Sequence, residues 1–355
     1  MSWLSESPVV SGGELTSRSA FLEPHIESLP ILILNVHSRC NCRCVMCDIW
    51  KREENQEIKS EALERHRLSM RRLGVQRVVL TGGEPLLHSD LSSLCTFFRE
   101  QNIQLTLLTT GLLLQKRATT VAQYFDDVIV SLDGPSAIHD QVRRIEGAYQ
   151  LIKDGISAVR QLRSQMPIHG RTTVQRANHQ HLVETVVAAQ ELGLDSISFL
   201  AADLTSEAFN RPLLWPVERQ NQISLDRQEV SALEQEIEAL IVLRSQMDRN
   251  YILESPSKLR RIALHFRAHL EGSSEESPVC NAPWVSAVVE VDGSVRPCFF
   301  HTRIGDIASS TLEEAINGEA AKQFRRTLDV ASNPTCRRCV CSLNYSVHPK
   351  SGTAE

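Results

Sequence analysis

The chain has 355 residues, of which 42% are hydrophobic and 23% charged, and its formal net charge is −5. This balance is typical of a folded globular protein and excludes a disordered or fibrous chain. No basic block with interleaved aromatic residues occurs, so we expect no nucleic-acid partner. No apolar run approaches the roughly 20 residues of a membrane span, and no leader-like segment opens the sequence, so we expect a cytoplasmic protein without membrane contact.

Short apolar runs alternate with longer amphipathic runs from Ile31 onward, which is the pattern of strand–helix units around a mostly parallel sheet. Six strands are predicted, at Ile31–Val36, Arg77–Leu80, Gln104–Leu108, Val128–Leu132, His169–Val174 and Ser196–Leu200. Helices are predicted between them, at Lys59–Arg72, Asp90–Glu100, Leu113–Tyr124, Tyr149–Arg163 and His181–Leu192. The fold class is therefore α/β.

The alternation stops after Leu200. Residues 201–221 are irregular, and Leu225–Met247 predicts a long amphipathic helix that forms a cap or bridge. Glu271–Ser277 is short and polar, which is typical of a linker. The expected divisions are an N-terminal extension (1–29), a core (30–215), a helical bridge (216–275), a cysteine-bearing domain (276–345) and a tail (346–355).

Ten cysteines are the main functional signal, because clustered cysteines in a reducing compartment are more often metal ligands or catalytic groups than disulfides. Cys40, Cys44 and Cys47 have C-x3-C-x2-C spacing directly after the first predicted strand. Three thiolates on one loop can bind three irons of a 4Fe–4S cluster and leave the fourth iron open, as a catalytic metal site requires.

A zinc site is the alternative interpretation of this cysteine loop (residues 40–47). Structural zinc takes four protein ligands, and Cys42 and His37 are the nearby candidates for the fourth. Cys42 is out of register with the other three cysteines, so we interpret it as a free thiol beside the site.

The cysteine loop with the following Asp48-Ile49-Trp50 resembles the signature of the radical S-adenosylmethionine (SAM) superfamily, and the resemblance extends through most of the chain. It implies a partial (β/α)6 barrel of the TIM type, with SAM bound to the open iron. Met46 stands where many members have an aromatic residue, and its backbone is expected to approach the adenine.

Thr81-Gly82-Gly83-Glu84-Pro85 follows the second predicted strand. Alone this turn is a weak signal, because glycine and proline are common in loops. Beside the cysteine loop it strengthens the resemblance, which implies that Gly82, Gly83 and Glu84 receive the ammonium group of the methionyl moiety.

Polar residues also follow the third and fourth predicted strands, at the rim where barrel enzymes gather active-site groups. Thr109, Ser131 and Asp133 can hydrogen-bond ribose hydroxyls, and the matching family positions line the nucleoside. Ordinary turn capping is the alternative for each. Arg143 lies in a segment that resembles relatives with an auxiliary-cluster domain, and it is a candidate for pairing with a carboxylate at the cofactor site. A solvated surface arginine is its alternative.

Asp203 and Arg211 lie beyond the sixth predicted strand, where substrate would meet the radical. Their position and the density of polar groups around them make them candidates for substrate recognition.

Four more cysteines form a complete ligand set near the C-terminus: Cys280, Cys298, Cys336 and Cys339. Asp292-Gly293 predicts a hairpin that brings the first two together. The set resembles the shortened SPASM/Twitch-type domain that binds one auxiliary 4Fe–4S cluster. Cys341 can replace one ligand, and a zinc ribbon is the alternative.

The sequence therefore predicts an enzyme with two 4Fe–4S clusters that cleaves SAM reductively and abstracts hydrogen from its substrate. The expected electron donor is a flavodoxin or ferredoxin. An auxiliary cluster that accepts an electron favours net oxidation, so we predict an oxidoreductase-like enzyme that modifies a peptide or protein. A radical dehydrogenase, epimerase or decarboxylase of a sugar or aminocyclitol is the alternative. The hypothesis from another class is a non-catalytic iron–sulfur electron carrier or metal-stabilised binding protein.

Overall fold

The computed structural model describes residues 23–345, except 207, 209–213, 249 and 274–276. Most of the expected N-terminal extension, part of the expected linker, the tail 346–355 and the candidate Arg211 lie outside the described residues. No helix among those described is long and apolar enough to cross a membrane.

Six parallel strands form the body of the sheet, close to where the sequence predicts them. They are β1 (Ile31–His37), β2 (Arg77–Gly82), β3 (Gln104–Thr109), β4 (Asp127–Ser131), β5 (Ile168–Val174) and β6 (Ser196–Ala201). Their order in the sheet follows the chain, and each pairs in parallel with the next. Buried runs such as residues 128–130 are apolar on both faces, because a parallel sheet is covered on both sides. The predicted α/β fold with a partial barrel is thus confirmed.

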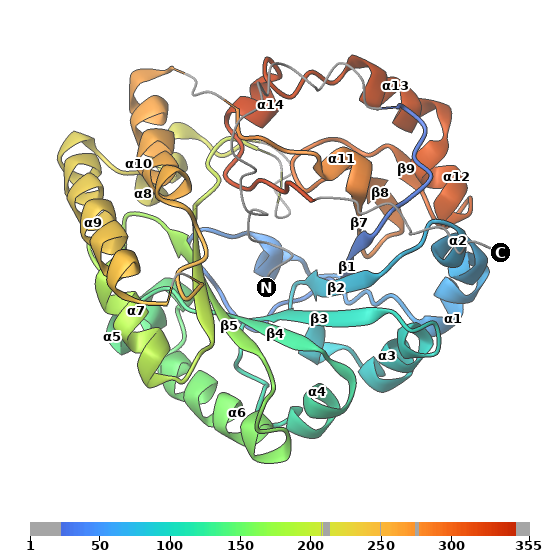
Figure 1. Cartoon of the computed structure of the whole chain (residues 1–355), viewed down its shortest axis with the longest axis horizontal. Coiled ribbons are helices and arrows are strands. Elements are labelled where there is room, and N and C mark those ends of the chain that lie inside the picture. Colours follow the sequence, from blue (N-terminus) through green and yellow to red (C-terminus); the bar gives the residue numbers. More distant parts are fainter. Residues whose placement is uncertain (1–22, 207, 209–213, 249, 274–276, 346–355) are drawn as a thin grey trace.

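Helices cover the outer side of the curved sheet (Figure 1). They are α1 (Ser60–Leu63), α2 (Arg67–Arg72), α3 (Leu91–Arg99), α4 (Ala118–Tyr124), α5 (Ser136–Arg143), α6 (Ala148–Leu162) and α7 (Leu182–Glu191). The helix predicted over Lys59–Arg72 is interrupted by a 3-10 turn at Glu64–His66. The helix predicted from Leu113 begins only at Ala118. Helix α5 was not predicted.

The bridge after β6 contains α8 (Val217–Ile223), α9 (Arg227–Gln246) and α10 (Pro256–Glu271). Helix α9 is the predicted long helix and starts with a capping box of Asp226 and Glu229. Helix α10 was not predicted, although its Ser255 cap followed by Pro256 is a typical start signal. It packs against α9 and β6, so its inner face reaches the interior of the barrel.

The C-terminal segment lies across the inner side of the curved sheet (Figure 1). Its elements are α11 (Ala282–Val285), β7 (Ser286–Val289), β8 (Ser294–Arg296), β9 (Gly305–Asp306), α12 (Leu312–Asn317), α13 (Glu319–Thr327) and α14 (Pro334–Arg337). Strand β7 pairs in parallel with β1 and extends the sheet. The predicted hairpin is present, since β7 and β8 are antiparallel and Gly293 in their turn has φ +86°. The helix predicted over Thr311–Thr327 is divided at Gly318.

Candidate active site

The cysteine loop lies directly after β1, at the carboxyl end of the sheet where barrel enzymes place their active sites. Cys44 is buried, and Cys40 and Cys47 are half-buried. Cys42 is buried between two of them, and hydrogen bonds to Cys40 and Cys44 together with burial raise its pKa. Its thiol therefore stays protonated beside the three predicted ligands.

The thiol of Cys44 is prepared for metal binding. A hydrogen bond from Cys42 and the charge of Arg143 outweigh burial and lower the pKa of Cys44 to about 6. The backbone amide of Ile49 donates to Cys47 Sγ at 3.4 Å. Hydrogen bonds of this kind to cysteine sulfurs are a feature of iron–sulfur sites, so the donor set of the loop fits the cluster that the sequence predicts.

Arg143 connects the cysteine loop to the rim of the barrel. Its Nη2 lies 2.6 Å from Asp133 Oδ2, and its Nη1 donates to Cys44 Sγ at 3.5 Å. The amide of Thr173 donates to the other carboxylate oxygen of Asp133 at 3.0 Å. Arg143 is only 6% exposed, so the surface alternative is wrong. The arrangement places a fixed positive charge beside a predicted iron ligand, and the predicted contact of Asp133 with ribose stays a prediction.

Glu84 is fully buried and joins the ends of β2 and β3. Its carboxylate accepts hydrogen bonds from Thr109 Oγ1 at 2.7 Å, the Thr110 amide at 2.7 Å and Thr110 Oγ1 at 2.8 Å. It also accepts from the Leu86 amide at 3.0 Å. Burial raises the pKa of Glu84, and these donors oppose that shift. The side chain therefore fixes the rim around the cysteine loop, and its predicted ammonium contact stays a prediction.

The two glycines of this turn are required by the approach of the cysteine loop. A Cβ on Gly83 would lie 2.0 Å from Arg39 O, and one on Gly82 would lie 2.9 Å from His37 O. The Gly83 amide donates to His37 O at 2.8 Å, and the Glu84 amide donates to Arg39 O at 2.9 Å. The turn thus positions the start of the cysteine loop through backbone contacts that a side chain would block.

The remaining candidates near the rim are less closely connected. Thr109 is buried, and its hydroxyl, which donates to Glu84, also accepts from the Gly111 amide at 3.1 Å. Ser131 ends β4 and is half-buried. Met46 packs against the hydrophobic core. Their predicted contacts with SAM stay predictions.

His37, the alternative zinc ligand, has both ring nitrogens in other interactions. Its Nδ1 accepts from the Arg39 amide at 3.0 Å, and its Nε2 lies 3.3 Å from Glu57 Oε1. No three His, Cys, Asp or Glu side chains among residues 23–345, apart from the omitted positions, surround one point closely enough to hold a single metal ion. A cubane cluster has a different requirement, because each of its cysteines binds a different iron.

Asp203 follows β6 and is buried. Its carboxylate accepts from Ser206 Oγ at 2.5 Å and from the Thr205 amide at 3.4 Å. The charge of Asp203 also acts on the neighbouring His265, whose pKa burial lowers to about 4. Asp203 therefore lies near α10 at the edge of the barrel interior, while its predicted partner Arg211 is not among the described residues.

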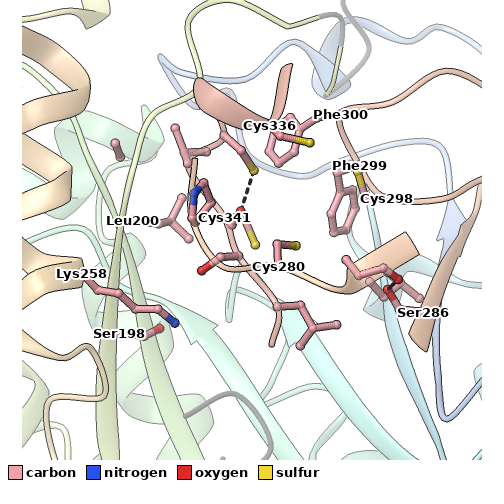
Figure 2. Close-up of a pocket in the computed structure, with 18 of the residues that line it drawn as sticks. Ser198, Leu200, Lys258, Cys280, Ser286, Cys298, Phe299, Phe300, Cys336 and Cys341 are labelled. Atoms are coloured by element: carbon pink, nitrogen blue, oxygen red, sulfur yellow. Dashed lines mark hydrogen bonds between the residues drawn. The ribbon is translucent and has the colours of Figure 1, made fainter. Parts of the chain in front are cut away.

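Five cysteines of the C-terminal segment line one cavity of about 220 Å³ (Figure 2). We call them the C-terminal cysteine group: Cys280, Cys298, Cys336, Cys339 and Cys341. The opposite wall of this cavity is the inner face of the sheet, from β1 to β6. Figure 2 shows Phe299 and Phe300 beside these cysteines.

The thiols of this group influence one another. Burial and the neighbouring thiols raise the pKa of Cys336 to about 12, and burial is the main cause that raises the pKa of Cys298 to about 11. Thiols gathered in this way are deprotonated when metal binds them, so the group fits an auxiliary cluster. Arg261 on α10 holds the C-x2-C segment, since its Nη2 donates to the carbonyls of Arg337 and Cys339 at 3.3 and 3.4 Å.

The same cavity contains charged residues that the sequence analysis did not select. Arg171 comes from β5, Lys258 from α10, and Glu254 from the segment just before α10. The sequence contains one local signal for Arg171, which is an arginine inside the otherwise uncharged strand β5. The other two depend on α10, which was not predicted.

Comparison with known families agrees with these two sites. Residues 34–200 match the radical SAM superfamily, and residues 280–340 match an iron–sulfur cluster-binding domain named SPASM. These matches bear out the predicted cofactors, which are 4Fe–4S clusters and SAM.

Curated relatives are enzymes with diverse substrates. The pre-heme d1 synthase of Dinoroseobacter shibae is 31% identical over 47% of this chain, which spans 42% of that protein's length. The GTP 3′,8-cyclase of Streptomyces coelicolor is 26% identical over 83% of this chain and 84% of that enzyme. The AdoMet-dependent heme synthase of Methanosarcina barkeri is 25% identical over 82% of each chain.

Solved structures share the fold. SuiB of Streptococcus suis, bound to its precursor peptide SuiA, has a TM-score of 0.62 and 17% identity over 89% of this chain and 70% of SuiB. The enzyme anSMEcpe with bound AdoMet has a TM-score of 0.63 and 20% identity over 89% of this chain and 93% of that one. At these identities the likeness concerns the fold alone.

Proposed function

This chain belongs to the radical SAM superfamily, and we propose that it oxidises a substrate held in the cavity between the inner sheet face and the C-terminal cysteine group. The observation that carries the proposal is that all five cysteines of this group line the same cavity as the sheet. A substrate there would lie next to an electron acceptor.

A 4Fe–4S cluster held by Cys40, Cys44 and Cys47 would supply the electron that splits SAM into methionine and a 5′-deoxyadenosyl radical, and one held by the C-terminal cysteine group would accept the electron that the substrate radical loses. The substrate would give one hydrogen atom to the 5′-deoxyadenosyl radical, which becomes 5′-deoxyadenosine, and would then lose one proton and one electron, so it would be oxidised by two electrons overall. A flavodoxin or ferredoxin is the proposed source of the first electron.

The residues of the chain supply position and environment. Arg143 and the turn at Gly83 hold the cysteine loop, and Glu84 holds the rim beside it. Apolar side chains of β1 to β4 exclude water from one wall of the cavity, which protects a radical from side reactions. Arg261 holds the C-x2-C segment against the opposite wall.

We propose a peptide or protein side chain as the substrate. The support is that the SPASM domain is present and that SuiB and anSMEcpe, which share the fold, have been crystallised with peptides. A small metabolite is the second candidate, favoured by curated relatives named as heme synthases and GTP cyclases.

The test is SAM cleavage by protein that is reconstituted with iron and sulfide without oxygen and then reduced with dithionite. We expect 5′-deoxyadenosine to form at several turnovers per chain, measured by liquid chromatography with mass spectrometry. An electron carrier or a zinc-stabilised binding protein would form none, and that result would contradict the proposal.

A further inference from the structure

The two sides of the cavity differ in chemistry. Strands β1 to β4 contribute apolar side chains, among them Ile33, Val79, Leu108 and Ile129. Strands β5 and β6 and helix α10 also contribute apolar side chains, such as Leu200 and Ile262, but the charged side chains Arg171 and Lys258 lie on this side. A ligand that fits both sides has an apolar body and one polar end.

Arg171 is the central polar group. It lies in the middle of β5, and its Nε donates to Ser198 Oγ on β6 at 3.3 Å. The guanidinium has four further N–H donors on its terminal nitrogens. Among the described residues, no side chain or carbonyl accepts from these four, and no carboxylate forms an ion pair with Arg171. Ser198 holds the guanidinium through Nε, and the N–H groups of the two terminal nitrogens stay available. This arrangement is suited to bind a carboxylate with two parallel hydrogen bonds.

Lys258 adds a second positive charge to the same wall. It is in the first turn of α10, and Figure 2 shows its side chain extending toward Ser198, the residue that accepts from Arg171. Both cations act electrostatically on the thiol of Cys341, which also lines the cavity. The two charges and the C-terminal cysteine group therefore border one space.

Glu254 limits the net charge of this wall. Its Oε2 accepts from the Phe199 amide at 2.9 Å, so the carboxylate is held in place beside the cavity. Arg261 of α10 also lines this cavity, so with Glu254 ionised three cations and one anion leave a net charge of +2. This net positive charge favours an anionic ligand such as a carboxylate.

We propose that Arg171 and Lys258 bind a carboxylate group of the substrate, so that its carbon chain lies on the apolar wall. The use of this cavity by substrate rests on the proposed function. The carboxylate could belong to an acidic side chain of a peptide or to a small organic acid, and the chemistry of recognition is the same for both.

Binding of matched acid–amide pairs to the full-length protein, reconstituted with its clusters and supplied with SAM, tests this inference. The organic-acid pair is 4-phenylbutanoate and 4-phenylbutanamide, and the peptide pair is N-acetyl-glutamyl-N-methylamide and its glutaminyl analogue. Isothermal titration calorimetry measures each Kd. At least one acid should bind about 10- to 100-fold more tightly than its amide, the range for one charge-assisted contact, and that pair identifies the source.

Variants of Arg171 and Lys258 test whether these residues cause the preference for the acid over its amide. Arg171→Gln should bring the acid and its amide to within about twofold of each other, and Arg171→Lys should keep part of the preference. Lys258→Met should weaken acid binding as well, and it supplies the test if the Arg171 variants unfold. Arg72→Gln is the matched control, because Arg72 is 63% exposed on α2 outside the cavity.

Two results would overturn the inference. One is that neither acid binds better than its amide at up to about 10 mM, a limit that corresponds to negligible affinity. The other is that Arg171→Gln and Lys258→Met both keep the preference. Formation of 5′-deoxyadenosine by the wild-type protein is measured separately, so failure of carboxylate binding is distinguishable from failure of the proposed function.

Discussion

The cysteine loop and the C-terminal cysteine group present their thiols in different ways. The cysteine loop is contacted by several distant parts of the chain. Arg143 from α5 donates to Cys44, Arg219 from α8 donates to Val45 O, and Trp215 Nε1 donates to Asp48 Oδ2 at 2.8 Å just after the loop. Its shape is therefore set by the barrel together with the bridge that follows it.

The C-terminal cysteine group instead borders an open cavity. Burial raises the pKa values of its Cys298 and Cys336, whereas the pKa of Cys44 is lowered to about 6. The fold therefore favours the thiolate of Cys44 and the protonated thiols of Cys298 and Cys336, which metal binding would deprotonate. The first region is thus held by contacts from other parts of the chain, whereas the second borders the cavity in which we propose that substrate binds.

The largest effect is expected when a ligand of the cysteine loop is removed. Cys44→Ala should lose about four irons per chain and all 5′-deoxyadenosine formation, because two thiolates do not hold the cube. Iron analysis and product analysis measure both. Cys42→Ala, in the same loop, is the matched control and should keep its iron. Equal iron in both variants would contradict the assignment of Cys44.

The connection between the cysteine loop and the barrel is tested next. Arg143→Met leaves the carboxylate of Asp133 buried without its counter-ion, which should reduce the free energy of unfolding by about 3–5 kcal/mol. Denaturant unfolding measures the change. The neighbouring Arg144 is exposed, so Arg144→Met should change stability by less than about 0.5 kcal/mol. Similar losses in both variants would show that the buried ion pair is not the cause.

Glu254, the acidic residue beside the cavity, predicts that the free energy of unfolding depends on pH. Burial raises the pKa of Glu254 from 4.5 to about 7, so the folded protein binds a proton more tightly there than the unfolded chain does. This group therefore opposes folding increasingly as pH rises from 4.5 to 7. Glu254→Gln removes this unfavourable contribution. The unfolding free energy of the variant relative to wild type should therefore rise by about 2 kcal/mol from pH 5 to pH 8. A difference in unfolding free energy that is independent of pH would contradict this.

The smallest effect concerns the attachment of the C-terminal cysteine group. Arg261→Met removes the two hydrogen bonds to the carbonyls of Arg337 and Cys339, at a cost of about 1 kcal/mol. Because these contacts hold the C-x2-C segment, we expect a chelator to remove iron faster from the auxiliary site while overall unfolding changes little. Arg260→Met is the control, since the exposed Arg260 of α10 pairs with Glu238 of α9 instead. Equal chelation rates in the two variants would argue against the contact.

Local patterns were sufficient for much of the fold. The apolar runs predicted all six parallel strands because buried strands are continuous in hydrophobicity, and Asp292-Gly293 predicted its hairpin because the turn needs a positive φ. The parallel pairing of β7 with β1 joins residues more than 250 positions apart, and no local pattern indicates it.

The site was predicted less completely, for a similar reason. The spacing of Cys40, Cys44 and Cys47 is local and was recognised directly. The burial of Arg143 depends on Asp133 and Cys44, which meet it only in the folded chain, whereas most arginines are exposed. Arg171 was missed because the curvature of the sheet and the position of α10 decide that it borders the cavity.

The proposed function requires that the cysteine loop hold a cluster with one iron open to SAM. Electron paramagnetic resonance of the reduced Cys280→Ala/Cys298→Ala protein tests it most directly, because the cluster of the cysteine loop then dominates the spectrum. We predict a 4Fe–4S signal whose shape changes when SAM is added. A signal that SAM leaves unchanged, or zinc in place of iron at the loop, would contradict the account.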